Sequence, residues 1–62
     1  MVTDFSELIR TALEVRPRLR RELAEEFEVA ESTVDRWAKR AAKPHPRIEK
    51  MVREFVTGML SK

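Results

Sequence analysis

Hydrophobic residues recur along this 62-residue chain at steps of three and four, the spacing that places side chains on one face of an α-helix. Four segments have this pattern, and they are separated by prolines or by a change in the phase of the hydrophobic positions. No stretch alternates between apolar and polar residues for long enough to predict a β-strand. The pattern therefore predicts an all-α domain, a compact bundle of four helices.

The first helix is predicted to run from about Asp4 to Val15, and Asp4 followed by Glu7 has the spacing of a capping box. Pro17 closes this helix, because the residue before a proline is disfavoured in the α-helical region. A second helix is predicted to begin near Pro17 or Arg18, since proline suits a first helical turn. The apolar residues of the two helices are Phe5, Leu8, Ile9, Ala12 and Leu13, then Leu19, Leu23 and Phe27.

The hydrophobic positions change phase between Glu28 and Glu31, which predicts a tight break before a third helix. This third helix is expected to continue past residue 40 and to be ended by Pro44 and Pro46. Its predicted buried residues are Val34, Trp37 and Ala41, and its predicted open face carries Ser32, Arg36, Lys39 and Lys43. The fourth helix, at about 47–60, carries Ile48, Met51, Val52, Phe55, Val56, Met59 and Leu60.

The composition argues against catalysis and against a bound cofactor. A chain of this length forms one domain and buries only about 60% of its unfolded surface. It has no cysteine, which excludes disulfides and cysteine-ligated zinc, and its single glycine, Gly58, cannot form a phosphate-cradling loop. His45 lies between two prolines with no carboxylate or cysteine beside it, so we interpret it as a loop residue. We expect neither an enzyme nor a metal site.

The longest apolar runs are far too short for a membrane span or a signal peptide. Because the chain also lacks cysteine, we expect no membrane association and a soluble, reducing, cytoplasmic location.

Charged residues make up 39% of the chain and are segregated along it, although 13 Lys and Arg against 11 Asp and Glu leave a net charge of only +2. All charged residues between Glu22 and Asp35 are acidic, and all charged residues between Arg36 and Arg47 are basic. A further basic cluster comprises Arg16, Arg18, Arg20 and Arg21. The near-neutral total therefore conceals two basic regions.

The second predicted helix has its charges in the unfavourable order. Its arginines lie near the start, where the helix dipole is positive, and its glutamates lie near the end, where the dipole is negative. Each exposed charge placed in this way destabilises the helix by about 0.3 to 1 kcal/mol. One interpretation is that the free amide groups at this helix start, together with the arginines, bind a phosphate. The other is that Arg18 pairs with Glu22 and Arg21 with Glu25 within the helix.

The segment Arg20 to Lys39, RRELAEEFEVAESTVDRWAK, resembles the helix-turn-helix of phage repressor and Cro proteins and their bacterial relatives. The resemblance covers the chain from Arg16 to about Arg47 and places a helix-turn-helix at about 18–42. Ala24 matches the small residue at the contact between the two helices, and Val29 matches the apolar residue of the turn. The other matching positions are Leu23, Phe27, Val34 and Trp37.

The sequence departs from that family at two positions where relatives often carry glycine, Glu28 in the turn and Arg40 further on. Glycine is favoured there because it adopts left-handed φ freely, whereas other residues lose roughly 1 kcal/mol. Ala30 is also a poor N-cap where Ser or Thr is usual, a loss of about 1 kcal/mol.

The resemblance implies sequence-specific binding of double-stranded DNA, with the third helix in the major groove, and hence a transcriptional regulator such as a repressor. The first turn and open face of that helix would read bases. Arg36 is the strongest candidate, because a guanidinium can bind guanine O6 and N7 together, although it could instead pair with Asp35 or Glu31. The base-reading candidates are Glu31, Ser32, Thr33 and Arg36, and the phosphate-binding candidates are Arg18, Arg20, Lys39, Arg40 and Lys43.

A domain this small buries only about 600 to 1,000 Å² on DNA, so a homodimer is expected. The candidates for a dimer or partner contact on the fourth helix are Phe55, Met59 and Leu60, and the alternative for Met59 and Leu60 is that they fold back on the first helix. The alternative function is a small protein–protein interaction module that uses the apolar C-terminal helix, with the charges serving solubility.

Overall fold

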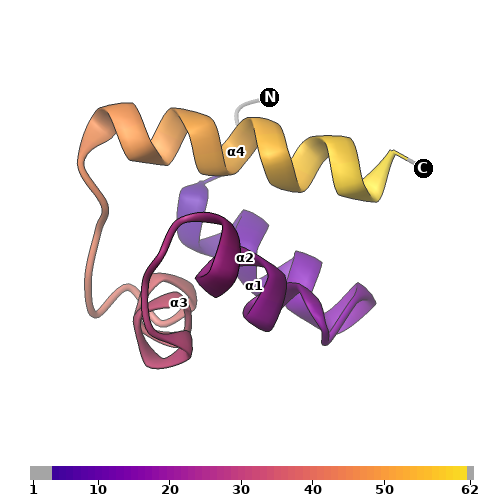
Figure 1. Ribbon diagram of the computed structural model, residues 1–62, viewed down its shortest axis with the longest axis horizontal. Coiled ribbons are helices and arrows are strands. Elements are labelled where there is room, and N and C mark those ends of the chain that lie inside the picture. The colour runs from indigo at the N-terminus through magenta and orange to yellow at the C-terminus, as the bar shows by residue number, and fades with distance from the viewer. Residues whose placement is uncertain (1–3, 62) are drawn as a thin grey trace.

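The computed structural model describes residues 4–61, and within this range the chain is all-helical (Figure 1). This confirms the predicted fold class, a compact arrangement of four helices without strands in the described part. The helices are α1 (Phe5–Val15), α2 (Leu19–Glu26), α3 (Glu31–Ala38) and α4 (Pro46–Leu60). Within the described range no helix is both long enough and apolar enough to cross a membrane.

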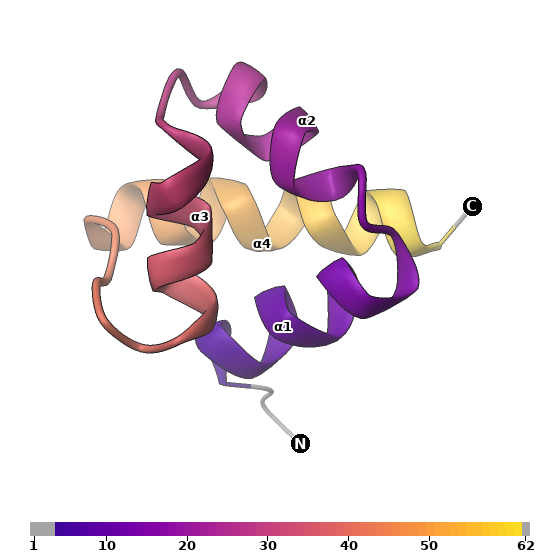
Figure 2. The ribbon, with the colours of Figure 1, turned by 90° about the horizontal axis from the view of Figure 1, so that it is seen from below.

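The helices form two levels. α4 runs the length of the molecule on one side, and α1, α2 and α3 lie together beneath it (Figures 1 and 2). α3 packs against both α1 and α2, whereas α4 packs mainly on α1. The C-terminal end of α4 therefore lies away from α3, at the opposite end of the molecule in both views.

One hydrophobic core holds all four helices together. Phe5 of α1 meets Trp37 of α3 edge to face, with ring centroids 5.9 Å apart, and Phe27 meets Phe55 of α4 in the same way. Such pairs contribute about 0.5 to 1.5 kcal/mol beyond the burial of their area. The buried core residues are Phe5, Ile9, Ala12, Leu19, Leu23, Ala24, Val34, Trp37, Val52 and Val56.

Polar side chains cap the first and last helices. The Asp4 carboxylate accepts a hydrogen bond from the Glu7 amide at 3.4 Å, which provides the first half of the predicted capping box. At the start of α4, Pro46 occupies the first turn and His45 Nδ1 accepts from the Arg47 amide at 3.2 Å. His45 is thus a loop residue, and its ring serves as an N-cap.

The third helix is shorter than predicted, and this changes the position of two residues. α3 ends at Ala38, so Ala41 is exposed and does not belong to the buried face. Lys43 is exposed as expected, but it lies in the connection to α4 and not on a helix face. Pro44 follows the end of α3 by several residues, and the reversal of the chain at Arg40 ends the helix.

Candidate nucleic-acid interface

The connection between α2 and α3 depends on Glu28, which has a left-handed φ of 52°. After α2 ends, the Phe27 amide donates to the Leu23 carbonyl at 3.0 Å and the Val29 amide donates to the Ala24 carbonyl at 2.9 Å. This six-to-one hydrogen bond closes a Schellman-type helix end, which normally carries glycine at the left-handed position. The turn expected from the phase change is therefore present, and it has the strained residue that the missing glycine predicts.

Arg40 makes the same reversal at the end of α3, with φ of 63°. The Ala41 amide donates to the Arg36 carbonyl at 2.9 Å, and the Arg40 amide donates to the Trp37 carbonyl at 3.3 Å. Among residues 4–61, Glu28 and Arg40 are the residues with positive φ, and both are positions where the sequence suggested that glycine would be favoured.

α3 has one buried side and one open side. Val34 is fully buried and Trp37 is 3% exposed, so these two residues anchor the helix from behind. Ser32 and Arg36 are exposed on its other side, and Lys39, the C-cap residue directly after the helix, is exposed as well. The predicted separation of anchoring and outward-facing residues is confirmed for the helix itself.

The first turn of α3 is not capped by a side chain. Ala30 occupies the N-cap position without a side-chain hydrogen bond, as the sequence suggested. Glu31 and Ser32 are exposed, whereas Thr33 is partly buried. The exposed start of α3 therefore combines unsatisfied amide donors with two polar side chains.

Asp35 of α3 is neutralised by a residue of α2. Its carboxylate lies 3.0 Å from Nε of Arg20, and both side chains are partly exposed. The sequence offered Asp35 and Glu31 as partners for Arg36, but within residues 4–61 Arg36 forms no ion pair with either. The guanidinium of Arg36 is therefore available on the open side of α3.

Acidic residues partner most of the arginines at the start of α2. Arg16 binds Glu22 through two hydrogen bonds, at 2.8 and 3.1 Å, so Glu22 pairs with Arg16 and not with Arg18 as suggested. Arg21 and Glu25 form the expected pair at 3.4 Å. The N-cap residue Arg18 forms no ion pair among residues 4–61. Internal pairing thus offsets much of the unfavourable charge order of this helix.

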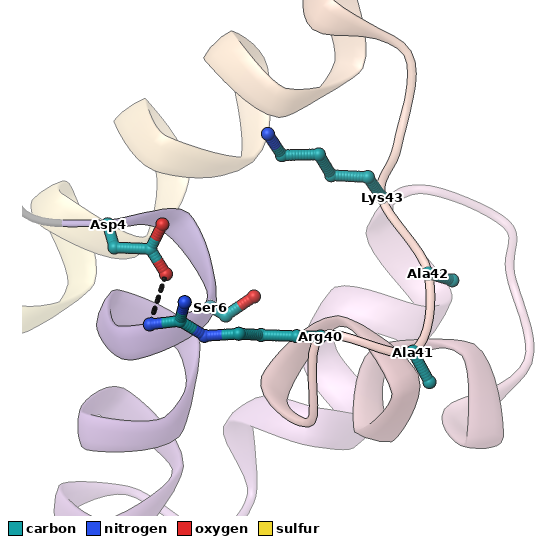
Figure 3. Close-up of a pocket in the computed structure, with 6 residues that line it drawn as sticks. All are labelled: Asp4, Ser6, Arg40, Ala41, Ala42 and Lys43. Atoms are coloured by element: carbon teal, nitrogen blue, oxygen red, sulfur yellow. Dashed lines mark ion pairs between the residues drawn. The ribbon is translucent and has the colours of Figure 1, made fainter.

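A pocket of about 400 Å³ lies where the chain leaves α3 and passes the start of α1 (Figure 3). Arg40 and Lys43 contribute cationic side chains to it, and the residues between them, 41 and 42, form part of its wall. Arg40 Nη2 lies 3.1 Å from the Asp4 carboxylate. Two predicted phosphate-binding residues therefore line a single hollow, and one of them has an acidic partner.

The apolar residues of α4 are used mostly within the molecule. Phe55 packs on Phe27, which directly follows α2, and Met59 packs against the core. Leu60 remains 37% exposed. The other large exposed hydrophobic residues of the described range are Val15 at 69% and Met51 at 50%.

Two residues of this region were not identified from the sequence, Asp4 as the partner of Arg40 and Ser6 as a wall of the pocket. Ser6 is the buried polar residue of α1, with 7% of its surface exposed. The local sequence pattern could not place either residue in the pocket, because the other residues that line it lie more than thirty positions further along the chain.

Comparisons of the chain with protein-family models, with curated proteins and with solved structures yield no match. Among the described residues, no three His, Asp or Glu side chains are grouped in a way that could hold a metal ion.

Proposed function

We propose that this chain binds double-stranded DNA as a helix-turn-helix domain, with α3 entering the major groove and α2 above it. The observation that carries this proposal is the two-sided character of α3. Val34 and Trp37 fix one side in the core, while Arg36 is exposed on the other side and Lys39 directly after the helix, neither with an ion pair in residues 4–61. A helix held rigidly from behind with free cations in front suits insertion into a groove lined by phosphates.

The acidic residues of this region are compatible with such a contact. Asp35, which would repel a phosphate, is held by Arg20 at 3.0 Å. The exposed cations Arg18, Lys39 and Lys43 remain without an acidic partner among residues 4–61 and would contact the sugar–phosphate backbone. Base reading is assigned to Glu31, Ser32, Thr33 and Arg36, on the first turn and open side of α3.

The proposal extends to regulation of transcription by a homodimer. A single small domain buries too little surface on DNA for tight specific binding, and a second copy doubles the buried contact area. With Phe55 and Met59 packed in the core, Leu60 is the exposed member of the three candidates for a dimer contact. Sedimentation equilibrium with and without duplex measures whether the second copy is present.

The deciding experiment measures binding of a random-sequence duplex as a function of salt. We expect affinity to fall steeply between 50 and 200 mM salt, because phosphate contacts release counterions. Arg36→Ala combined with Lys39→Ala should weaken binding at least about tenfold and lower the salt slope by about 1 to 2.

The matched control is Arg47→Ala combined with Lys50→Ala, which removes the same charge from exposed positions on α4. This control should retain most of the affinity. A folded wild-type chain that binds no duplex at low salt, or an equal loss in both double variants, would contradict the proposal.

Sequence readout is tested by selecting bound duplexes from a random pool with the wild type and with Arg36→Ala. If Arg36 reads a guanine, the variant should lose discrimination at one position of the site, by about 1 to 3 kcal/mol. An unchanged preference at every position would remove Arg36 from the base-reading set.

A further inference from the structure

The pocket between α1 and the end of α3 contains donors that the structure leaves unused. Only 7% of the surface of Ser6 is exposed, yet within residues 4–61 its hydroxyl group makes no hydrogen bond. Figure 3 shows this hydroxyl directed into the space between the Arg40 and Lys43 side chains. No side-chain N or O atom in residues 4–61 is fully buried without a hydrogen-bond partner, so this hydroxyl still reaches the solvent of the pocket and can donate to a ligand there.

The same place is the start of an eleven-residue helix. The Leu8 amide donates to the Asp4 carbonyl at 2.9 Å and the Glu7 amide to the Asp4 side chain at 3.4 Å. The amides of Phe5 and Ser6 remain among the helix-start donors that have no acceptor within the helix. A helix start with free amides carries a partial positive charge and suits an anion.

Two cations complete the pocket. Lys43 forms no ion pair among residues 4–61, and Arg40 binds the Asp4 carboxylate at 3.1 Å with its side chain still 65% exposed. Among residues 4–61, Asp4 is the one acidic residue that lines this pocket, and its carboxylate is the ion-pair partner of Arg40. A hydroxyl group, a helix start and two cations are together a donor set that can bind a phosphate.

We propose that this pocket binds one phosphodiester of the DNA backbone beside the C-terminal end of α3, through the hydroxyl and amide groups of Ser6 and the side chains of Arg40 and Lys43. The proposal rests on the proposed function. A duplex with α3 in its groove brings a backbone strand past the end of that helix, where Arg40 follows directly. Asp4 then acts as a competing anion, which the phosphate displaces from Arg40.

The test compares duplex affinity at low salt for Ser6→Ala, Asp4→Asn and the wild type. Ser6→Ala should weaken binding about tenfold or more, because a hydrogen bond to a charged group is lost. Asp4→Asn should strengthen binding several-fold, because asparagine keeps the cap of α1 but no longer competes for Arg40. The opposite directions exclude a loss of folding as the common cause.

Thr11→Ala is the matched control, since Thr11 is an exposed residue with a hydroxyl group on the same helix and does not line this pocket. Its affinity should equal that of the wild type. Amide resonances of Phe5 and Ser6, followed during titration with the duplex and separately with inorganic phosphate, locate the contact.

The outcomes separate the two proposals. In one outcome the duplex shifts amide resonances of α3 but not those of Phe5 and Ser6, and Ser6→Ala and Asp4→Asn bind with unchanged affinity. This result would overturn the phosphate pocket and leave the proposed function intact. Shifts with inorganic phosphate alone would assign the pocket to a free anion and overturn the backbone contact. No duplex binding by the wild type would overturn both.

Discussion

At the scale of single residues, Glu28 and Arg40 are the positions where local conformation opposes residue type. Each ends a helix with a left-handed φ, of 52° and 63°. A side chain in this conformation costs of order 1 kcal/mol or more, because Cβ approaches a backbone carbonyl oxygen. The hydrogen bonds from Val29 and Ala41 back to the preceding helices hold the two residues in place.

Glycine at position 28 should therefore stabilise the fold. We expect Glu28→Gly to raise the free energy of unfolding by about 0.5 to 1 kcal/mol, after allowance for the greater freedom of glycine in the unfolded chain. Urea denaturation measures the change.

Glu26→Gly is the matched control, since it makes the same replacement at an exposed glutamate whose backbone is helical. That variant should lose about 1 kcal/mol. A loss of stability in Glu28→Gly as well would mean that the left-handed turn is not strained.

At the scale of helices, α3 is held against α2 by polar as well as apolar contacts. The Arg20–Asp35 ion pair joins the two helices across the turn, whereas the Arg21–Glu25 pair lies within one helix and is far more exposed. The first pair therefore links α3 to α2, whereas the second lies within α2 and affects only local helix stability.

A double-mutant cycle on Arg20→Ala and Asp35→Ala should give a coupling energy of about 0.2 to 1 kcal/mol, the range for partly exposed pairs. The corresponding cycle on Arg21 and Glu25 should give no more than about 0.5 kcal/mol. Both are measured by chemical denaturation at low and high salt. A zero coupling for Arg20 and Asp35 at low salt would show that the pair does not restrain α3.

Sequence periodicity was sufficient for the number of helices and for the side of α3 that is buried, because Val34 and Trp37 have helical spacing and no competing role. It failed at the end of α3. The spacing of Lys43 is consistent with a helix that continues, and the prolines beyond it predicted that α3 would end near residue 43. The helix instead ends at Ala38, because the backbone turns at Arg40.

The long-range partners could not be predicted at all. Asp35 has basic residues near it in the sequence, yet it pairs with Arg20 from the preceding helix. The pocket that joins Ser6 to Arg40 depends on how α1 packs against α3, which no local pattern specifies.

At the scale of the whole molecule, stability rests on one small core that includes a single tryptophan. Trp37 contacts the ring of Phe5 and is 3% exposed. The free energy of unfolding for a domain of this length is about 3 to 9 kcal/mol. Removal of one large core side chain therefore takes a major part of it.

Trp37→Ala should cost about 3 to 5 kcal/mol and leave the chain largely unfolded at 37 °C. Far-UV circular dichroism and a urea titration measure the loss. Met51→Ala, at a half-exposed position on α4, should cost less than about 1 kcal/mol. A cooperative transition in Trp37→Ala near that of the wild type would show that this residue is not central to the core.

The left-handed conformation of Arg40 sets thermal tolerance against the proposed duplex affinity at one backbone position. Selection of variants for heat resistance should enrich glycine there, since it relieves the conformation at the end of α3. If Arg40 binds a phosphodiester as proposed, selection for duplex retention should enrich arginine or lysine, since the contact needs a long cationic side chain. Independent selections from the same library at position 40 should therefore diverge, and a thermostabilised form of the protein should be the weaker binder.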